Sequence, residues 1–441
     1  MFVRTLDMPG ILSRLAGAAA LAFGLVLMGA SPAAAVPAFA VQTGQPCQMC
    51  HIGGFGPQLT AFGREFKMKG YTQRSGNINV PLSVMAVASY IHTQADQPPT
   101  PGFGANDNVA LDQVSVFLAG GIGDHFGGFV QTTYDGIGKA FTWDNTDLRA
   151  VTTLDVHGAN VVLGASLNNN PTVQDAWNTL PAWGYPYTGS ALAPSPAAAP
   201  LLAGSLAQEA VGLTGYAWIN SEVYLEGGGY VTPGASFLTH VGADPIGIGD
   251  IHGVAPYARV AYQKAFGTNQ NVEVGAFFMQ ADIFPMRDRT FGTDRYTDWG
   301  LDASYQQTFA NNDVITANAR YIDEQQALNA TFAGGGSDNP RESLRSFQID
   351  GSYYWRDKIG GTVQVFNTSG SFDDTLFGGK PDSTGVTFQV DGTPFGNSDS
   401  PLGRRFNVRV GVQYTAYTEF NGTSAGASDN NTLRVFTWLA Y

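Results

Sequence analysis

Hydrophobic and polar residues alternate over several long stretches of this chain. In residues 406–416 every second residue is apolar, and the residues between them are polar or glycine. Residues 346–355 and 298–306 follow nearly the same pattern. A period of two is typical of a β-strand with one apolar and one polar face. Stretches of about ten residues have the length that a tilted strand needs to cross a membrane, whereas strands in soluble sandwiches are near 5–6 residues.

Sixteen segments of this kind follow one another. They start near residues 79, 109, 126, 146, 159, 209, 221, 255, 269, 296, 313, 344, 358, 384, 404 and 432. Short connections fall at 123–125, 157–160, 220–221, 267–269, 311–313 and 356–358, and longer ones lie between them, including 136–145. The link at 393–403 breaks this rule, because it is too long for a tight turn. An even number of strands with short periplasmic turns and long outer loops is typical of bacterial outer-membrane barrels.

The pattern therefore predicts an all-β fold, a transmembrane outer-membrane β-barrel of about 16 strands over residues 79–441. Both of its ends should lie on the periplasmic side. A large soluble β-sandwich is the alternative. The longest connection, 168–200, is rich in Pro, Ala and aromatic residues, and we expect an irregular lid or a surface loop there.

Composition and the N-terminus favour the barrel. Residues 1–35 predict a secretory signal peptide, because two arginines accompany a short apolar run over 15–30 and an Ala-x-Ala site ends at Ala35. The mature chain is expected to begin at Val36, and Ala38–Ala40 offers a second possible cleavage site. The chain has 55 glycines, 12% aromatic and 13% charged residues, which fits a barrel whose apolar positions are hidden by alternation. The net charge of −13 argues against a nucleic-acid partner.

The only two cysteines of the chain stand in a Cys-x-x-Cys-His motif before the first predicted strand. Cys47 and Cys50 lie one helical turn apart, and His51 follows directly. This spacing attaches haem c, with the histidine as proximal iron ligand. Residues 36–78 are therefore predicted to be a small cytochrome c segment with one covalent haem. A Cys47–Cys50 redox disulfide and half of a zinc site are the alternatives; the first lacks a βαβ context and the second lacks further ligands.

Methionines are the first candidates for the distal haem ligand. Alternation in the first predicted strand sends Ser83, Met85, Val87 and Ser89 to the lumen. Met85 is therefore the tentative distal ligand, and Met279 and Met68 rank behind it.

A short helix is predicted after the motif. In it Leu59, Phe62 and Phe66 would share one apolar face that covers the haem, with Met68 on the opposite side.

The same parity places charged residues in the lumen. They are Asp147, Asp155, Glu222, Glu226, Glu273, Asp298, Asp302, Asp350, Arg149, Arg259, Arg320 and Arg409. Structural ion pairs in a water-filled lumen are the ordinary interpretation. The alternative is that some carboxylates, with Asp323, Glu324, Asp373 and Asp374 in outer loops, attract a hard divalent cation.

Residues 37–93 resemble the start of the fused monohaem cytochrome c–porins of the bacterial outer membrane, which are ferrous iron oxidases. The resemblance rests on "PAFAVQTGQPCQMCH", "PQLTAFGREFKMKGY" and "PLSVMAVASYIHT" and is architectural over the rest. It implies an iron:cytochrome c oxidoreductase that passes electrons from extracellular ferrous iron to a periplasmic carrier such as a soluble cytochrome c. The motif residues match the family's haem motif position by position. The alternative function is a porin or uptake channel whose haem segment is a plug or sensor.

Overall fold

The structure is a computed structural model that describes residues 38–76, 81–397, 400–402 and 406–441. The expected signal peptide (1–35) and the predicted start of the first strand (79–80) lie outside the described residues.

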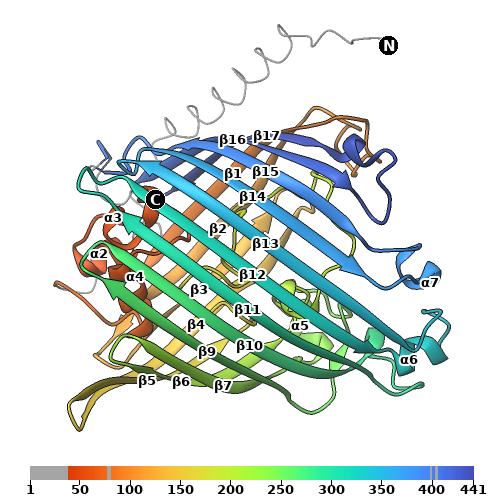
Figure 1. Cartoon of the computed structure of the whole chain (residues 1–441), viewed down its shortest axis with the longest axis horizontal. Coiled ribbons are helices and arrows are strands. Elements are labelled where there is room, and N and C mark those ends of the chain that lie inside the picture. Colours follow the sequence, from red (N-terminus) through yellow and green to blue (C-terminus); the bar gives the residue numbers. More distant parts are fainter. Residues whose placement is uncertain (1–37, 77–80, 398–399, 403–405) are drawn as a thin grey trace, which may run out of the picture.

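The described part of the chain forms one sheet of sixteen long strands and one two-residue strand (Figure 1). The strands are β1 (Leu82–Thr93), β2 (Asn108–Ile122), β3 (Phe126–Asp135), β4 (Ala140–Val156), β5 (Ala159–Asn168), β6 (Val211–Ile219), β7 (Val223–Val231), β8 (Asp250–Ile251), β9 (Ala255–Phe266), β10 (Gln270–Phe284), β11 (Asp294–Thr308), β12 (Val314–Ala327), β13 (Arg341–Trp355), β14 (Ile359–Gly370), β15 (Ser383–Gly392), β16 (Asn407–Glu419) and β17 (Thr432–Ala440). The predicted all-β fold is confirmed.

The sheet closes on itself, as an outer-membrane β-barrel requires. β1 pairs antiparallel with β2 on one side and with β17 on the other. All other long strands pair antiparallel with their neighbours in sequence, apart from the insertion of short β8 between β7 and β9. The segment before the irregular link at 393–403 is β15, which pairs along its length with β14 and β16. None of the helices in the described parts is long and apolar enough to cross a membrane.

The predicted alternation decides which face each residue takes. In β16 the side chains of Val410, Val412 and Tyr414 are exposed on the outer face, whereas Arg409 and Gln413 are buried in the lumen. Strands of outer-membrane barrels have an apolar face toward the bilayer and a polar face toward the lumen, and these strands follow that rule.

The two ends of the barrel differ. The end that we call the turn end carries short connections such as 123–125, 157–158 and 356–358, together with the C-terminus. The opposite loop end carries α5 (Ala235–His240), η3 (Pro285–Arg287), α6 (Asn329–Ala333), α7 (Asp374–Phe377) and η4 (Ala427–Asn430). One loop-end connection is shorter than predicted, 136–139 instead of 136–145, because the β3–β4 hairpin continues beyond a bulge between Val130 and Thr132.

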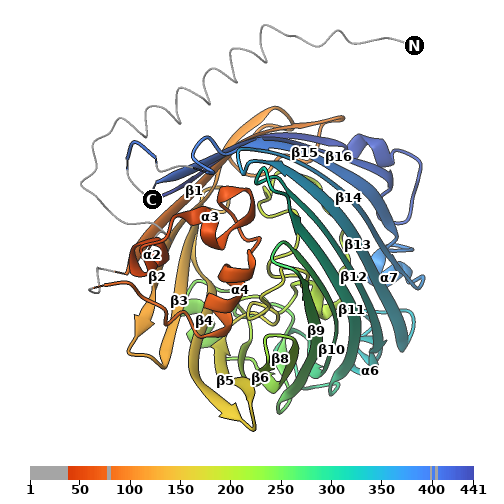
Figure 2. The ribbon, with the colours of Figure 1, turned by 60° about the vertical axis from the view of Figure 1, so that its left-hand side comes forward.

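Residues 38–76, which we call the plug, lie at the turn end, partly at the rim of the barrel and partly inside its mouth (Figure 2). The plug contains α2 (Ala38–Thr43), α3 (Cys47–Cys50), η1 (Ile52–Gly54) and α4 (Ala61–Met68). The Tyr71 hydroxyl donates to Asp147 Oδ2 of β4 at 2.7 Å, and the Tyr216 hydroxyl of β6 donates to the Met68 carbonyl oxygen at 2.6 Å. These buried hydrogen bonds fix the plug to the barrel wall.

The connection between β5 and β6, residues 169–210, is not the lid or surface loop that its composition suggested. It folds into the lumen, and we call it the inner loop; residues 168–180 are all buried. Its Leu180, Leu201, Leu202 and Leu206, with η2 (Leu201–Ala203), form a core with lumen-facing side chains of the barrel that include Met279. The prediction failed because the loop's apolar residues bury themselves against the inner wall without any regular period.

Most of the predicted lumen charges are buried inside the barrel. The exceptions are Asp155, which is exposed, and Glu222, which is half-buried at the turn end. Within the described residues, no three His, Cys, Asp or Glu side chains gather as a metal site would require. Asp373 caps α7 and accepts from Leu376 N at 2.7 Å, and Asp323 pairs with Arg345 at 3.0 Å. The prediction that Asp323 and Glu324 lie in an outer loop is wrong, because strand β12 continues to Ala327 and includes both. Glu324 is buried and accepts from Leu201 N at 2.6 Å. These acids therefore have structural partners.

Candidate functional site

The Cys-x-x-Cys-His motif forms a single helical turn at the turn end of the barrel. α3 begins at Cys47 after Pro46, whose carbonyl oxygen accepts from Met49 N at 3.0 Å. The His51 amide donates to the Cys47 carbonyl oxygen at 2.9 Å and ends the turn. Residues three apart share one face of a helical turn, so both thiol side chains point the same way. Both cysteines are half-buried thiols.

Thr60 connects the motif to the following helix, α4. Its side chain caps α4 by accepting from Gly63 N at 3.2 Å and also donates to the Met49 carbonyl oxygen at 2.5 Å. The Thr60 amide donates to the Cys50 carbonyl oxygen at 2.9 Å. A threonine at the N-cap is among the preferred caps of a helix. Here the same residue also fixes the orientation of α3.

Gly63 permits the close approach of α4 to the motif. A Cβ atom at this position would lie 2.3 Å from the Cys50 carbonyl oxygen. We expect Gly63→Ala to separate α3 from α4 at a cost of about 1–3 kcal/mol, the usual penalty for overpacking. Hydrogen exchange of the Thr60 amide, which bonds to Cys50, measures this local loss. Gly234→Ala is the control, because nothing lies within 4 Å of that position; equal loss of protection in both variants would contradict the prediction.

His51 has the protonation state that an iron ligand needs. Burial, followed by the nearby Arg409 guanidinium, lowers the pKa of His51 to about 4, so the imidazole is neutral at pH 7. Within the described residues its buried Nδ1 atom has no hydrogen-bond partner. A neutral imidazole is the form that binds metals. For Cys50, burial and then the Cys47 side chain raise the pKa to about 12, so its sulfur stays a thiol.

The motif residues face a cavity of about 420 Å³ inside the barrel, which we call the motif cavity. Aromatic side chains from the plug, the barrel wall and the inner loop form much of its lining: Phe39, Phe55, Phe66, Tyr71, Phe117, Phe129, Trp183, Tyr187 and Trp438. Its volume falls within the ~300–1,000 Å³ of ordinary ligand and cofactor sites, which are also mostly apolar. The cavity is therefore suited to a flat, largely apolar group.

Of the three methionines that the sequence offered, Met85 lines the motif cavity. It enters from β1 and packs against both aromatic clusters beside the cavity, one around Phe117 and one around Trp438. Met68 and Met279 also point into the barrel, but both are fully buried in other clusters and do not line this cavity. The parity of the first strand therefore placed Met85 correctly on the lumen side.

The predicted apolar face of the helix after the motif is only partly correct. Leu59 and Phe66 line the motif cavity, whereas Phe62 does not, and Gly63 and Lys67 take part instead. α4 spans only Ala61–Met68 and Leu59 precedes it, so the helical spacing does not extend back to Leu59.

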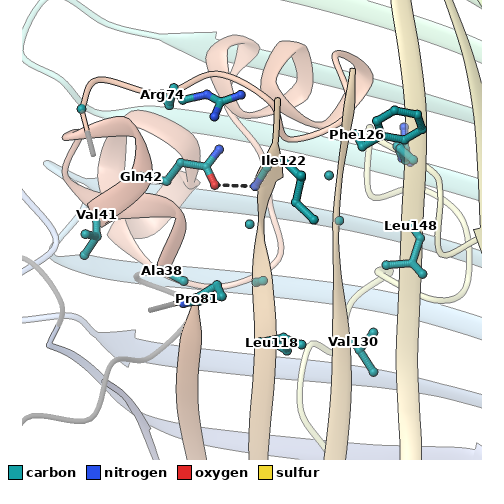
Figure 3. A pocket seen from close by; sticks show the side chains of 17 residues that line it. Ala38, Val41, Gln42, Arg74, Pro81, Leu118, Ile122, Phe126, Val130 and Leu148 are labelled. Carbon is teal, nitrogen blue, oxygen red and sulfur yellow. Dashed lines mark hydrogen bonds between the residues drawn. The ribbon is translucent and has the colours of Figure 1, made fainter. Parts of the chain in front are cut away.

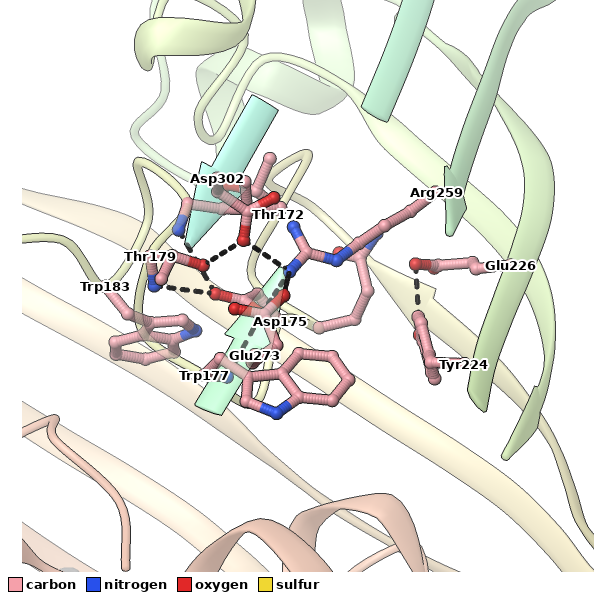
Figure 4. Close-up of polar contacts among 12 residues, drawn as sticks. Thr172, Asp175, Trp177, Thr179, Trp183, Tyr224, Glu226, Arg259, Glu273 and Asp302 are labelled. Atoms are coloured by element: carbon pink, nitrogen blue, oxygen red, sulfur yellow. Dashed lines mark hydrogen bonds and ion pairs between the residues drawn. The ribbon is translucent and has the colours of Figure 1, made fainter. Parts of the chain in front are cut away.

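An ion-pair cluster holds the inner loop beside the plug (Figure 4). Arg259 of β9 lies 3.3 Å from Asp175 of the inner loop, 3.3 Å from Glu273 of β10 and 2.9 Å from Asp302 of β11. The Lys67 ammonium group donates to the backbone oxygen of Asp175 at 2.6 Å. Three neighbouring strands of the barrel wall, the inner loop and the plug thus meet in one buried polar cluster.

A second hollow, of about 420 Å³, lies at the rim beside α2 (Figure 3). The Gln42 side chain accepts from Gly121 N of β2 at 2.8 Å and joins α2 to the rim. The hollow is also lined by the outward-facing Ile122 and Phe126, which are 74% and 58% exposed. None of the motif residues lines it, so it is separate from the candidate site.

The sequence did not reveal the polar lining of the motif cavity or the contribution of the inner loop. Gln113, Gln131, Asp144 and Asn145 come from β2, β3 and β4, and Trp183 comes from the inner loop. Alternation predicts which side of the sheet a strand residue takes, but it does not predict its height in the barrel. The inner loop has no period from which to place Trp183.

We compared the chain with family models, with curated proteins and with solved structures. No family model matches the sequence. No curated protein is similar to it. Among solved structures, OmpT of Vibrio cholerae has 10% sequence identity and a TM-score of 0.43, over 82% of this chain and 97% of that chain. An anion-selective porin from Comamonas acidovorans has 11% identity and a TM-score of 0.43, over 82% and 98%. The channel DcaP of Acinetobacter baumannii has 13% sequence identity and a TM-score of 0.45, over 84% of this chain and 99% of that chain.

Proposed function

We propose that this protein is an electron-transfer protein of the bacterial outer membrane that carries one covalent haem c. Cys47 and Cys50 would hold the porphyrin by thioether bonds, His51 would be the proximal iron ligand and Met85 the distal one. The observation that supports the proposal is that all four side chains line one cavity within the barrel. Electrons would pass from an extracellular donor, with ferrous iron the leading candidate, to a periplasmic carrier such as a soluble cytochrome c.

The residues around the motif fit such a group. The imidazole of His51 is neutral, aromatic side chains make up the walls, and a thioether side chain enters from β1. Haem c supplies one-electron redox chemistry, whose potential depends on the axial ligands and on burial. The chain itself would attach the group, orient its ligands and exclude bulk water through Phe66, Phe117 and Trp438.

The position of the motif supports a direction for the transfer. The motif lies at the turn end, and short turns face the periplasm in bacterial outer-membrane barrels. Met49, between the two cysteines, is 41% exposed at that end. A periplasmic carrier could therefore approach α3 directly. A donor at the loop end would be separated from a periplasmic carrier by an apolar band of ~25 Å, which one buried carrier inside the barrel would help to bridge.

The alternative function is a porin or uptake channel in which the plug is a stopper or a sensor. The barrel architecture is compatible with it. In that case the plug and the inner loop would have to move to widen a path, because both lie within the barrel and are held by buried hydrogen bonds.

One experiment separates the two functions. The protein is expressed with its c-type maturation system, purified and tested for covalent haem by its reduced-minus-oxidised spectrum. Ferrous iron is then added without oxygen, and reduction of the haem is the expected result. The same preparation in liposomes should pass no small solutes. A haem that stays oxidised with iron in excess, together with solute flux, overturns the electron-transfer proposal in favour of the channel.

Met85→Leu tests the distal ligand while nearly conserving side-chain volume. Since a Met ligand raises the potential of a His-ligated haem, we expect the variant to show a changed visible spectrum and a lower midpoint potential. Met279→Leu is the matched control, because Met279 is equally lumen-facing but lies in another cluster. An unchanged spectrum and potential in Met85→Leu would reject Met85 as the ligand.

A further inference from the structure

Lys67 of the plug is the only lysine or arginine among the described residues that line the motif cavity. It is buried, and its ammonium nitrogen lies 4.9 Å from the centre of the Trp183 ring, which lines the same cavity. Lys67 follows Gly63 by four residues, so both lie on the face of α4 that packs against Cys50. A buried cation therefore lies in the cavity wall, one helical turn from the motif.

The hydrogen bonds of this ammonium group do not neutralise its charge. It donates to the backbone oxygen of Val173 at 2.7 Å and to that of Asp175 at 2.6 Å, both in the inner loop. Among the described residues no carboxylate forms an ion pair with it, because the neighbouring acids have other partners. Its positive charge therefore acts on whatever group occupies the cavity.

The charged side chains that act on Lys67 come from three surrounding elements: Asp147 and Arg149 of β4, Glu226 of β7 and Asp175 of the inner loop. The two residues of β4 pair with each other at 2.9 Å. Asp175 pairs with Arg259 at 3.3 Å, and Glu226 accepts from the Tyr224 hydroxyl at 3.0 Å. Burial, followed by the Arg149 guanidinium, lowers the pKa of Lys67 to about 7. The cation is therefore lost as the pH rises above neutral.

We infer, resting on the proposed function, that the ammonium group of Lys67 raises the midpoint potential of the haem held by the motif. Oxidised haem carries one more positive charge than reduced haem, so a cation in the cavity wall disfavours the oxidised form. The aromatic lining of the cavity screens this interaction less than water would. Lys67 acts on the haem through its charge and is not a ligand of the iron.

The interaction also works in the opposite direction. Reduction of the haem removes a positive charge and thereby favours the protonated amine. In the pH range where Lys67 titrates, the electron that reduces the iron is accompanied by a proton from solvent that binds the Lys67 amine, and both leave on oxidation. The potential should therefore fall as the pH rises through the pKa of Lys67, because the neutral amine no longer disfavours the oxidised form.

Three other titratable side chains line the motif cavity besides those of the motif: Asp144, Tyr71 and Tyr187. Burial raises the pKa of Tyr71 and of Tyr187 above its usual value, so neither hydroxyl titrates near neutral pH. Asp144 of β4 accepts three side-chain hydrogen bonds. Asp144 and the carboxylates of the haem itself are the groups from which the effect of Lys67 has to be separated.

Potentiometric titration of the holoprotein below and above neutral pH tests the inference. Lys67→Gln keeps an NH₂ donor for the inner loop but removes the charge. At a separation of about 10 Å and an effective dielectric constant of about 20, one unit charge changes the reduction equilibrium about tenfold, which is about 59 mV for one electron. We expect the potential of Lys67→Gln below neutral pH to be lower than that of the parent by about this amount. Its fall near neutral pH should disappear.

Two further variants make the test specific. Lys67→Arg keeps the charge at every working pH, because a guanidinium group does not deprotonate in proteins, and should keep the high potential without the fall. Lys69→Gln is the matched control, because Lys69 is 33% exposed, pairs with Glu65 and does not line the cavity. It should leave the profile unchanged. Visible spectra of all three variants check that the axial ligands of the iron are the same.

Each outcome decides between stated alternatives. A fall of the parent's size that persists in Lys67→Gln or in Lys67→Arg belongs to Asp144 or to the carboxylates of the haem, and overturns the inference. An unchanged potential in Lys67→Gln, with a loss of stability, would show that Lys67 only holds the inner loop to the plug, and also overturns it while the proposed function stands. Absence of covalent haem from the parent chain overturns the proposed function and this inference with it.

Discussion

Replacing both cysteines, Cys47→Ala/Cys50→Ala, is expected to remove covalent haem completely. Each thioether bond needs one of these sulfurs, and the chain has no other cysteine. The measurement is the haem stain of the denatured protein on a gel and the pyridine haemochrome spectrum. Because the mature barrel makes its hydrogen bonds without the thiols, we expect the variant still to reach the outer membrane and to migrate as a folded barrel.

Met49→Ala is the control for this loss. Met49 lies between the two cysteines on α3, is 41% exposed and does not line the motif cavity. This variant should keep its covalent haem in full. Covalent haem in the double cysteine variant, or equal loss in Met49→Ala, would contradict attachment through the motif.

Arg259→Met is expected to destabilise the interior of the barrel by about 3–5 kcal/mol, the usual cost of removing one partner of a buried ion pair. Arg259 is 3% exposed and contacts Asp175, Glu273 and Asp302. Without it, three buried carboxyl groups face one another, and the inner loop loses its ion pair between Asp175 and the wall. Urea unfolding in detergent micelles measures the loss, and limited proteolysis of residues 169–210 shows whether the inner loop detaches.

Two variants make this prediction specific. Arg295→Met removes an ion pair with Asp282 at the loop end, where the arginine side chain is 56% exposed, and it should cost at most about 1 kcal/mol. The double variant Arg259→Met/Asp302→Asn removes one of the unpaired carboxylates and should recover part of the stability. Equal losses in Arg259→Met and Arg295→Met would show that the buried cluster is not what holds the inner loop.

Much of the barrel could be predicted because the two faces of each strand meet different environments. Val412 faces the outside and Gln413 faces the lumen, so apolar and polar residues alternate in the sequence. The inner loop, in contrast, is surrounded by the lumen on all sides. Trp177 and Leu180 are buried among lumen side chains, while the backbone follows no regular path, so no periodic signal marks them.

The candidate site likewise has a part that the sequence predicts and a part that it does not. The Cys-x-x-Cys-His motif is local, and the side of Met85 follows from parity within one strand. The approach of Trp183 and Trp438 to the motif depends on how the inner loop folds and on where the last strand closes the barrel. Those contacts join residues that are far apart in the sequence, and hydrophobic patterning does not record such distances.

The contacts around the motif have a consequence for the order of events during folding. Its lining includes Trp438 of the last strand, and the Gly53 carbonyl oxygen beside the motif accepts from Arg409, which lies 356 residues later, at 3.1 Å. Contacts at such separation form late, because loop closure has to precede them. The wall of the motif cavity is therefore complete only after β16 and β17 have paired with their neighbours, so the surroundings of the two thiols are among the last parts of the molecule to form.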